Sequence, residues 1–122
     1  MKLSILATAL AMAVLPPCAH AHGQPKAQHG GVVAMANDLS FELVAQGQRT
    51  TLYLFDHDKP LEAKTFSGKL TRLSGSQKTE VELKPAGANR LEAAVSVSKG
   101  DKVVATLTSG DKKSHTVRFS LK

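Results

Sequence analysis

The stretch LEAAVSVSKGDKVVATLTSGDKKSHTVRFSL, residues 91–121, decides the fold. Apolar and polar residues alternate in it over 91–97, 103–107 and 117–121, and turn signals centred on Gly100 and Gly110 separate these runs. A period of two places successive side chains on opposite faces of a β-strand. The stretch therefore predicts three antiparallel strands, each with one face in the core and one in solvent.

The rest of the chain extends this pattern toward the N-terminus. From Val32 onward, turn signals recur every ten or so residues, and no helical period is sustained. Thr51 to Phe55 is apolar on both faces, so we expect a central strand or one that is covered on its second side. Short strands at this spacing are typical of sandwiches. We predict an all-β fold, an immunoglobulin-like antiparallel β-sandwich of about seven to eight strands over residues 31–122, although the buried Trp and Cys pair of that fold is absent.

The first residues have the organisation of a secretory signal. Lys2 precedes an uncharged apolar run from Leu3 to Leu15, and Ala19-His20-Ala21 offers a small-residue cleavage site. We expect a signal peptide over 1–21, cleavage after Ala21, a periplasmic mature protein and a flexible arm over 22–30. The alternatives are an uncleaved signal anchor and a lipoprotein cut before Cys18. A membrane span needs about 20 apolar residues, so we expect no membrane insertion after cleavage.

Composition narrows the possible chemistry. Cleavage removes the only cysteine, which leaves histidine, methionine, carboxylates and the terminus as metal ligands. The net charge is +6, but the basic residues are spread along the chain without interleaved aromatics, so we expect no nucleic-acid binding. No H-E-x-x-H, P-loop or G-x-S-x-G motif occurs, and we expect no enzyme activity.

Four histidines remain after cleavage, and none lies in the middle of a predicted strand. His22 becomes the first residue, where its α-amine and imidazole together can chelate Cu(II). Imidazole and amine nitrogens suit Cu(II) and Zn(II), and aspartates add oxygen ligands. The predicted metal ligands, drawn from the terminus, the Gly30-Gly31 entry to the first strand and a turn, are His22, His29, Asp56, His57 and Asp58.

Each candidate also has an interpretation without metal. His22 can be a consequence of the cleavage site, and His29 can serve only to introduce the Gly-Gly bend. Asp56-His57-Asp58 can be a hairpin turn whose aspartates bond their own backbone. His115 shares the apolar face of Val117, which favours a hydrogen-bonded residue at the rim of the core.

Three runs resemble a small β domain that accompanies the periplasmic adaptor (membrane fusion) subunits of heavy-metal efflux pumps: His29-Gly30-Gly31, Phe41-Glu42-Leu43-Val44 and Leu52 to Pro60. Shorter similarities at 68–70, 83–87 and 117–119 extend the resemblance over most of the mature chain. It implies a periplasmic role near copper, zinc, cobalt or cadmium export, with His29 and the turn 56–58 at recurring motif positions. The chain lacks the adaptor's helical hairpin and lipoyl-like half, which implies an accessory module.

The junction 19–22 is also similar to the start of periplasmic copper-resistance carriers, whose mature N-terminal histidine binds Cu(II). The leading hypothesis from the sequence is therefore a periplasmic accessory protein that binds Cu(II) or Zn(II) for heavy-metal efflux or resistance. The alternative is an interaction module without metal that docks onto an efflux adaptor. An oxidative copper enzyme built on His22 is a third, weaker hypothesis.

Overall fold

The computed structural model describes residues 25–122, so the predicted signal peptide and His22 lie outside the described residues. The described chain forms nine β-strands and one 3-10 turn, η1 (Ala63–Thr65), and contains no α-helix. The strands are β1 (Val32–Ala36), β2 (Leu39–Gln46), β3 (Arg49–Asp56), β4 (Lys59–Pro60), β5 (Ser67–Ser74), β6 (Gln77–Pro85), β7 (Arg90–Ala93), β8 (Lys102–Thr108) and β9 (Ser114–Ser120). The all-β prediction is confirmed, and the two-residue β4 is the addition to the expected number.

All strand pairs are antiparallel and follow the order β1-β2-β3-β7-β6-β5-β8-β9, with β4 on the same edge of β3 as β7. Strand β6 changes sheets, because residues 77–83 pair with β5 whereas Lys84 and Pro85 pair with β7. One sheet thus contains β1, β2, β3, β7 and the end of β6, and the other contains the first part of β6 with β5, β8 and β9. This is the strand order of an immunoglobulin-type sandwich.

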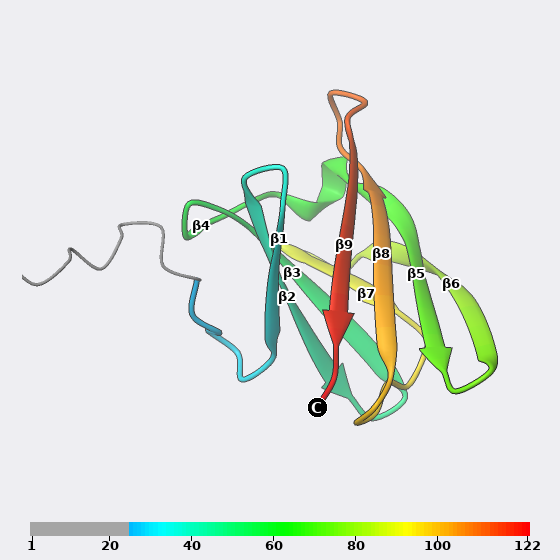
Figure 1. Cartoon of the computed structure of the whole chain (residues 1–122). Helices are drawn as coiled ribbons and strands as arrows, with labels where there is room; N and C mark the ends of the chain where they lie inside the picture. The colour runs from blue at the N-terminus through cyan, green and yellow to red at the C-terminus, as the bar shows by residue number, and fades with distance from the viewer. Residues whose placement is uncertain (1–24) are drawn as a thin grey trace, which may run out of the picture.

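The two remaining edges of the sandwich meet at β1 and β9. Figure 1 shows these two strands side by side, and they are in contact along their lengths. No backbone ladder joins them within residues 25–122, so side chains form this seam. The sandwich therefore closes on itself around one core.

The core is built from alternate positions of the strands, as the period of two predicts. The fully buried aliphatic side chains include Leu52 and Leu54 of β3 and Val103, Ala105 and Leu107 of β8. The intervening residues of β8, such as Thr106, face outward. Within the described residues, no helix has the length and hydropathy of a membrane span.

The expected strand over 91–97 is only partly present. Strand β7 ends at Ala93, although Val95 and Val97 remain buried at 7% exposure each. Beyond Ala93 the backbone leaves the ladder to cross to β8, and side chains replace the strand hydrogen bonds. Thr50 Oγ1 donates to the Val95 carbonyl at 2.7 Å, and Arg72 Nη1 donates to the Ser96 carbonyl at 2.8 Å.

Candidate functional site

A buried carboxylate on the outer face of β2 holds the chain that leads into β1. Glu42 is 1% exposed and accepts backbone N–H groups from Gln28 at 2.9 Å, His29 at 2.8 Å and Gly31 at 2.8 Å. These three hydrogen bonds satisfy a carboxylate that has almost no access to water. Residues 28–30, assigned from the sequence to a flexible arm, are thus hydrogen-bonded to the sheet. We call residues 28–31 the docked segment.

The two glycines of the docked segment have different structural roles. Gly30 has φ of +74°, a left-handed conformation that favours glycine. At Gly31 an added Cβ would lie 2.2 Å from the Leu43 carbonyl oxygen, so no larger residue fits there without a shift of the backbone. The Gly-Gly pair therefore allows the chain to approach β2 and surround the Glu42 carboxylate.

The imidazole of His29 lies flat against the outer face of β3. Its ring is stacked on Tyr53, with centroids 3.7 Å apart and an interplanar angle of 10°, and its centroid is 6.5 Å from that of Phe55. Neither ring nitrogen of His29 has a hydrogen-bond partner among residues 25–122. The expectation that β3 is covered on its second side is confirmed, and the docked segment contributes to this cover.

The turn after β3 presents the second candidate histidine. His57 and Asp58 have φ of +49° and +67°, as the two central residues of a tight hairpin between β3 and β4. The Asp56 Oδ1 atom is 2.6 Å from His57 Nδ1, and the side chains are 48% and 82% exposed. The alternative interpretation of these residues as a hairpin turn is confirmed, but the Asp56 carboxylate bonds the His57 ring and not its own backbone. Because Nδ1 is held by the carboxylate, Nε2 of His57 is the nitrogen left for a ligand.

The structure brings some of the predicted ligands together and not others. Asp56 and His57 are in direct contact, and His29 covers the strand that leads into their turn. His29 thus packs on β3, and His57 lies in the turn that follows β3. Within residues 25–122, however, no group of three or more His, Cys, Asp or Glu side chains is arranged to hold a metal ion. Asp58 makes no side-chain hydrogen bond or ion pair in the described chain.

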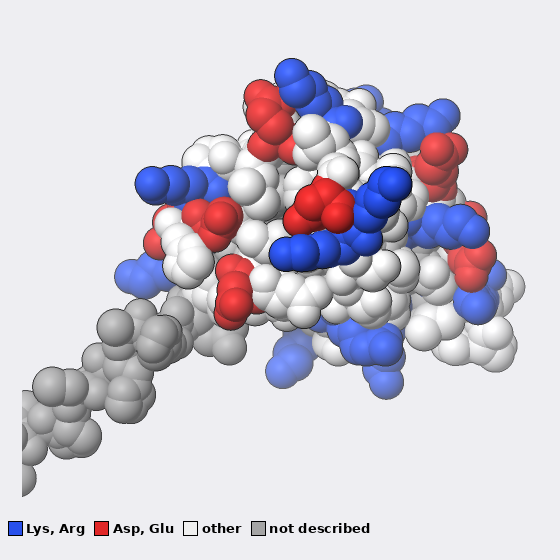
Figure 2. All heavy atoms as spheres, turned by 90° about the horizontal axis from the view of Figure 1, so that it is seen from above, with Lys and Arg blue, Asp and Glu red and all other residues white. Residues whose placement is uncertain are grey.

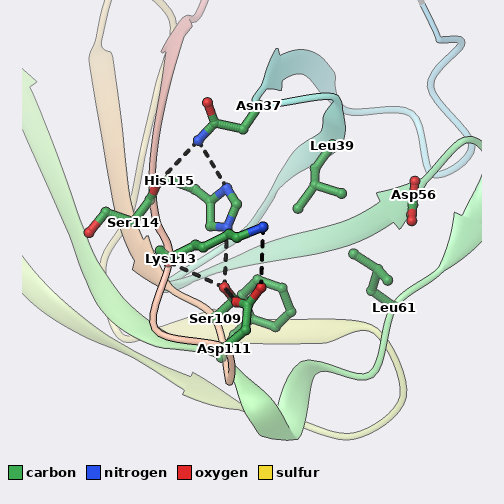
Figure 3. Close-up of a pocket in the computed structure, with 10 residues that line it drawn as sticks. Asn37, Leu39, Asp56, Leu61, Ser109, Asp111, Lys113, Ser114 and His115 are labelled. Atoms are coloured by element: carbon green, nitrogen blue, oxygen red, sulfur yellow. Dashed lines mark hydrogen bonds and ion pairs between the residues drawn. The ribbon is translucent and has the colours of Figure 1, made fainter.

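A pocket of about 720 Å³ lies next to Asp56, at the end of the sandwich that carries the β8–β9 hairpin (Figure 3). Apolar side chains of Leu39, Leu61 and Phe66 line part of it. Its polar lining is formed by Asn37, Asp56, Ser109, Asp111, Lys113, Ser114 and His115. Polar residues thus form most of its lining, whereas pockets that bind small molecules are lined mainly by apolar side chains.

His115 lies in this pocket and is 5% exposed. Its Nδ1 is 3.2 Å from Asn37 Nδ2, and its Nε2 is 3.3 Å from Ser109 Oγ. The amide Nδ2 of Asn37 also donates to the Ser114 carbonyl at 3.1 Å, so this side chain ties the β1–β2 turn to β9. Both ring nitrogens have partners, which confirms the expectation of a hydrogen-bonded residue at the rim of the core.

The polar chain continues from His115 to a carboxylate, as Figure 3 shows. Ser109 Oγ donates to Asp111, and this hydrogen bond, with a smaller contribution from Lys113 at 3.7 Å, lowers the pKa of Asp111 below its ordinary value. The Ser109 hydroxyl thus donates its hydrogen bond to Asp111 and lies 3.3 Å from Nε2 of His115, so it links the β8–β9 hairpin to the base of β9.

The surface at this end of the molecule is mixed in charge. Figure 2 shows lysine and arginine side chains interspersed with carboxylates when the molecule is seen from above. Ion pairs at the surface include Lys78 with Glu80 at 3.3 Å and Lys113 with Asp111 at 3.7 Å. The face seen in Figure 2 has no extended patch of one sign.

Sequence analysis did not identify Glu42 or Tyr53 as part of a site. Glu42 alternates with Phe41 and Leu43, a pattern that predicts a solvent-facing charge. Only the return of the docked segment across β2 buries it. The available signal is the presence of all three elements, Gly30-Gly31, Glu42 and Tyr53, in the runs that resemble the efflux-associated β domain.

No protein-family model, curated protein or solved structure matches this chain.

Proposed function

We propose that this protein is a periplasmic accessory protein of heavy-metal efflux or resistance that binds Cu(II) or Zn(II) at an open site beside β3. The ligands are the imidazoles of His29 and His57, with His22 at the mature terminus. Asp56 orients His57, and Asp58 is available as an oxygen ligand. The partner is an efflux adaptor that receives or supplies the ion.

The observation that carries the proposal is the Asp56–His57 pair. Histidines that bind metals commonly donate their second ring N–H to a carboxylate, which fixes the tautomer and makes the free nitrogen a better ligand. The 2.6 Å contact to Nδ1 leaves Nε2 of an 82% exposed side chain directed away from its partner. The same contact changes the sequence-based role of Asp56 from a direct ligand to a residue that orients one.

His29, in the docked segment that packs on β3, supplies a second nitrogen. A metal–imidazole bond lies in the plane of the ring, about 2.0–2.1 Å from nitrogen for zinc. Because the ring is parallel to Tyr53 within 10°, an ion on His29 lies at the edge of the stack and not between the rings. We expect His57, on the exposed turn, to complete the site at this edge, and a site that stays open to solvent can exchange its ion.

Tyr53 makes the site measurable, because it is the only tyrosine of a chain without tryptophan. We expect Cu(II) to quench its fluorescence through His29, and calorimetry of the protein that starts at His22 to show micromolar or tighter binding. His29→Ala and His57→Ala should each weaken the binding. Asp56→Asn should weaken it about 10- to 100-fold, as for other residues that orient metal ligands.

The matched control is Asp38→Asn. Asp38 occupies a two-residue turn like that of Asp58, with φ of +66°, but the neighbouring residue is Asn37 and not histidine. We expect metal binding to be unchanged by this variant. A version with one extra residue ahead of His22 separates the terminal amine from the other ligands: complete loss of binding on extension would contradict the role of His29 and His57.

The pocket beside His115 favours a second candidate function, a protein–protein interaction module that docks onto an efflux adaptor. Its apolar side chains Leu39, Leu61 and Phe66 can receive an apolar side chain of the partner. In that case neither metal gives a binding heat, and binding to a purified adaptor survives the combined replacement of His22, His29 and His57 by alanine. The same binding should be lost with Leu61→Asp.

A further inference from the structure

We propose that Glu42 is the positioning residue of the His29 ligand: its buried carboxylate docks residues 28–31 on β2 and so holds the imidazole on Tyr53, without touching the ion. The effect on affinity rests on the proposed metal function, whereas the docking does not depend on metal. Glu42 thereby couples the binding of an ion to the order of the chain ahead of β1.

Glu42 accepts hydrogen bonds from the backbone before, at and after His29. Its Oε2 atom accepts from the N–H of His29 itself and from that of Gly31, both at 2.8 Å, and its Oε1 atom accepts from Gln28 at 2.9 Å. The backbone is therefore fixed before, at and after the residue that carries the imidazole. With the backbone fixed, stacking on Tyr53 restrains the remaining side-chain rotations.

A ligand that is held in its bound conformation loses less conformational freedom when the ion arrives. In a free segment, His29 would sample many positions and reach the edge of β3 only rarely. The docked segment reduces this loss, because it holds the imidazole in one position, stacked 3.7 Å from Tyr53. The contribution of Glu42 to affinity is therefore indirect.

Glu42 is not itself a ligand. It is 1% exposed, and both carboxylate oxygens are occupied by backbone N–H groups. It also belongs to no cluster of metal-binding side chains in residues 25–122. Direct coordination would require the docked segment to leave β2 first.

The variant that tests this role is Glu42→Gln, which keeps the shape of the side chain but turns an NH₂ group toward backbone donors. The matched control is Glu92→Gln, which removes a carboxylate from β7, the strand that pairs with β3 on the edge away from β2. Glu92 contacts Arg49 at 3.7 Å and not the docked segment. Both variants are made in the protein that carries one extra residue ahead of His22, so that the terminal amine does not contribute.

Two measurements separate docking from affinity. Without metal, we expect Glu42→Gln to increase acrylamide quenching of Tyr53 and to abolish the nuclear Overhauser effects between His29 and Tyr53, while Glu92→Gln changes neither. With Zn(II), we expect an affinity about 10- to 100-fold lower for Glu42→Gln. This loss should disappear in a His29→Ala background, which a general loss of stability would not explain.

The outcomes distinguish this inference from the proposed function. If the parent protein binds Zn(II) and Glu42→Gln binds it equally well, the positioning role is wrong and the metal function stands. If this extended parent binds no metal, the proposed ligand role of His29 and His57 is wrong, and unchanged Tyr53 quenching in Glu42→Gln would refute the docking role as well. If Glu42→Gln does not fold, Gly31→Ala displaces the segment without altering the carboxylate and should give the same loss of affinity; unchanged affinity then overturns the proposal.

Discussion

At the scale of single residues, Glu42 is the most informative, because it is a charged side chain buried at a position where the alternation along β2 predicts exposure to solvent. Glu42 is buried because residues 28–31 cross over it, and this crossing is possible because Gly31 has no side chain. Gly31 therefore permits the close approach, and the Glu42 carboxylate accepts the hydrogen bonds that hold the segment there. The position of His29 depends on both.

We predict that Gly31→Ala separates the docked segment from β2. The new Cβ would meet the Leu43 carbonyl oxygen at 2.2 Å and Val44 Cγ2 at 2.8 Å. Overpacking of this kind costs about 1–3 kcal/mol, so the free energy of unfolding in urea should fall by that amount. Acrylamide quenching of Tyr53 should rise in the same variant.

Gly75→Ala is the control for this experiment. Gly75 differs from Gly31 in having positive φ, +59°, and an added Cβ there meets nothing within 4 Å. The variant should lose about 1–2 kcal/mol through its left-handed backbone alone and leave Tyr53 quenching unchanged. Equal quenching in the two variants would show that Gly31 does not control the docked segment.

At the scale of elements, side-chain hydrogen bonds replace backbone hydrogen bonds beyond the end of β7. Beyond Ala93, Val95 and Val97 of the segment that leads to β8 stay buried, and two of its carbonyl groups accept hydrogen bonds from Thr50 and Arg72. Thr50 is fully buried and lies opposite Ala93 in the β3–β7 pair. The hydroxyl of β3 therefore continues the pairing that β7 no longer provides.

We predict that Thr50→Val lowers the free energy of unfolding by about 1–3 kcal/mol, because it leaves the Val95 carbonyl without its donor. Amide hydrogen exchange should become faster in residues 94–98. Thr106→Val, on the exposed face of β8, is the control and should change stability by no more than about 0.5 kcal/mol. Unchanged stability and exchange in Thr50→Val would assign the order of this segment to Val95 and Val97 alone.

At the scale of the whole molecule, one core serves both sheets. The buried side chains of β2, β3, β8 and β9 form a single cluster, and β1 packs against it from the seam with β9. In the closed arrangement β1 and β9 face each other. A defect in any wall of this core should therefore reduce the stability of the entire sandwich.

We predict that Leu107→Ala lowers the free energy of unfolding by about 2–5 kcal/mol, because Leu107 is fully buried and its removal leaves a cavity. The urea midpoint should fall with an unchanged slope, and all probes should report one transition. Val104→Ala on the outward face of the same strand should cost about 1 kcal/mol or less. Equal losses in both variants would contradict the assignment of the two faces of β8.

How much of this could be predicted is clearest in β8 and β9. Alternation along 103–107 and 117–121 identified which residues are buried, because the period of a strand is local and fixed. The turn at 56–58 and the hydrogen-bonded His115 were also predicted. The end of β7 at Ala93 was not predicted. Alternation in sequence shows which residues are buried, but it does not show whether their backbone is hydrogen-bonded to a neighbouring strand.

The sequence by itself determined the all-β class, the faces of the strands and the residues able to bind a metal, since each depends on neighbouring residues or on side-chain chemistry. Only the tertiary structure decided the strand order, the crossing of β6 between sheets, the closure at β1 and β9, and the burial of Glu42 beneath residues 28–31. These features join segments far apart in the chain. Local periodicity carries no information on which segments meet, because that choice is made by the packing of a shared core and the hydrogen bonding of buried polar groups.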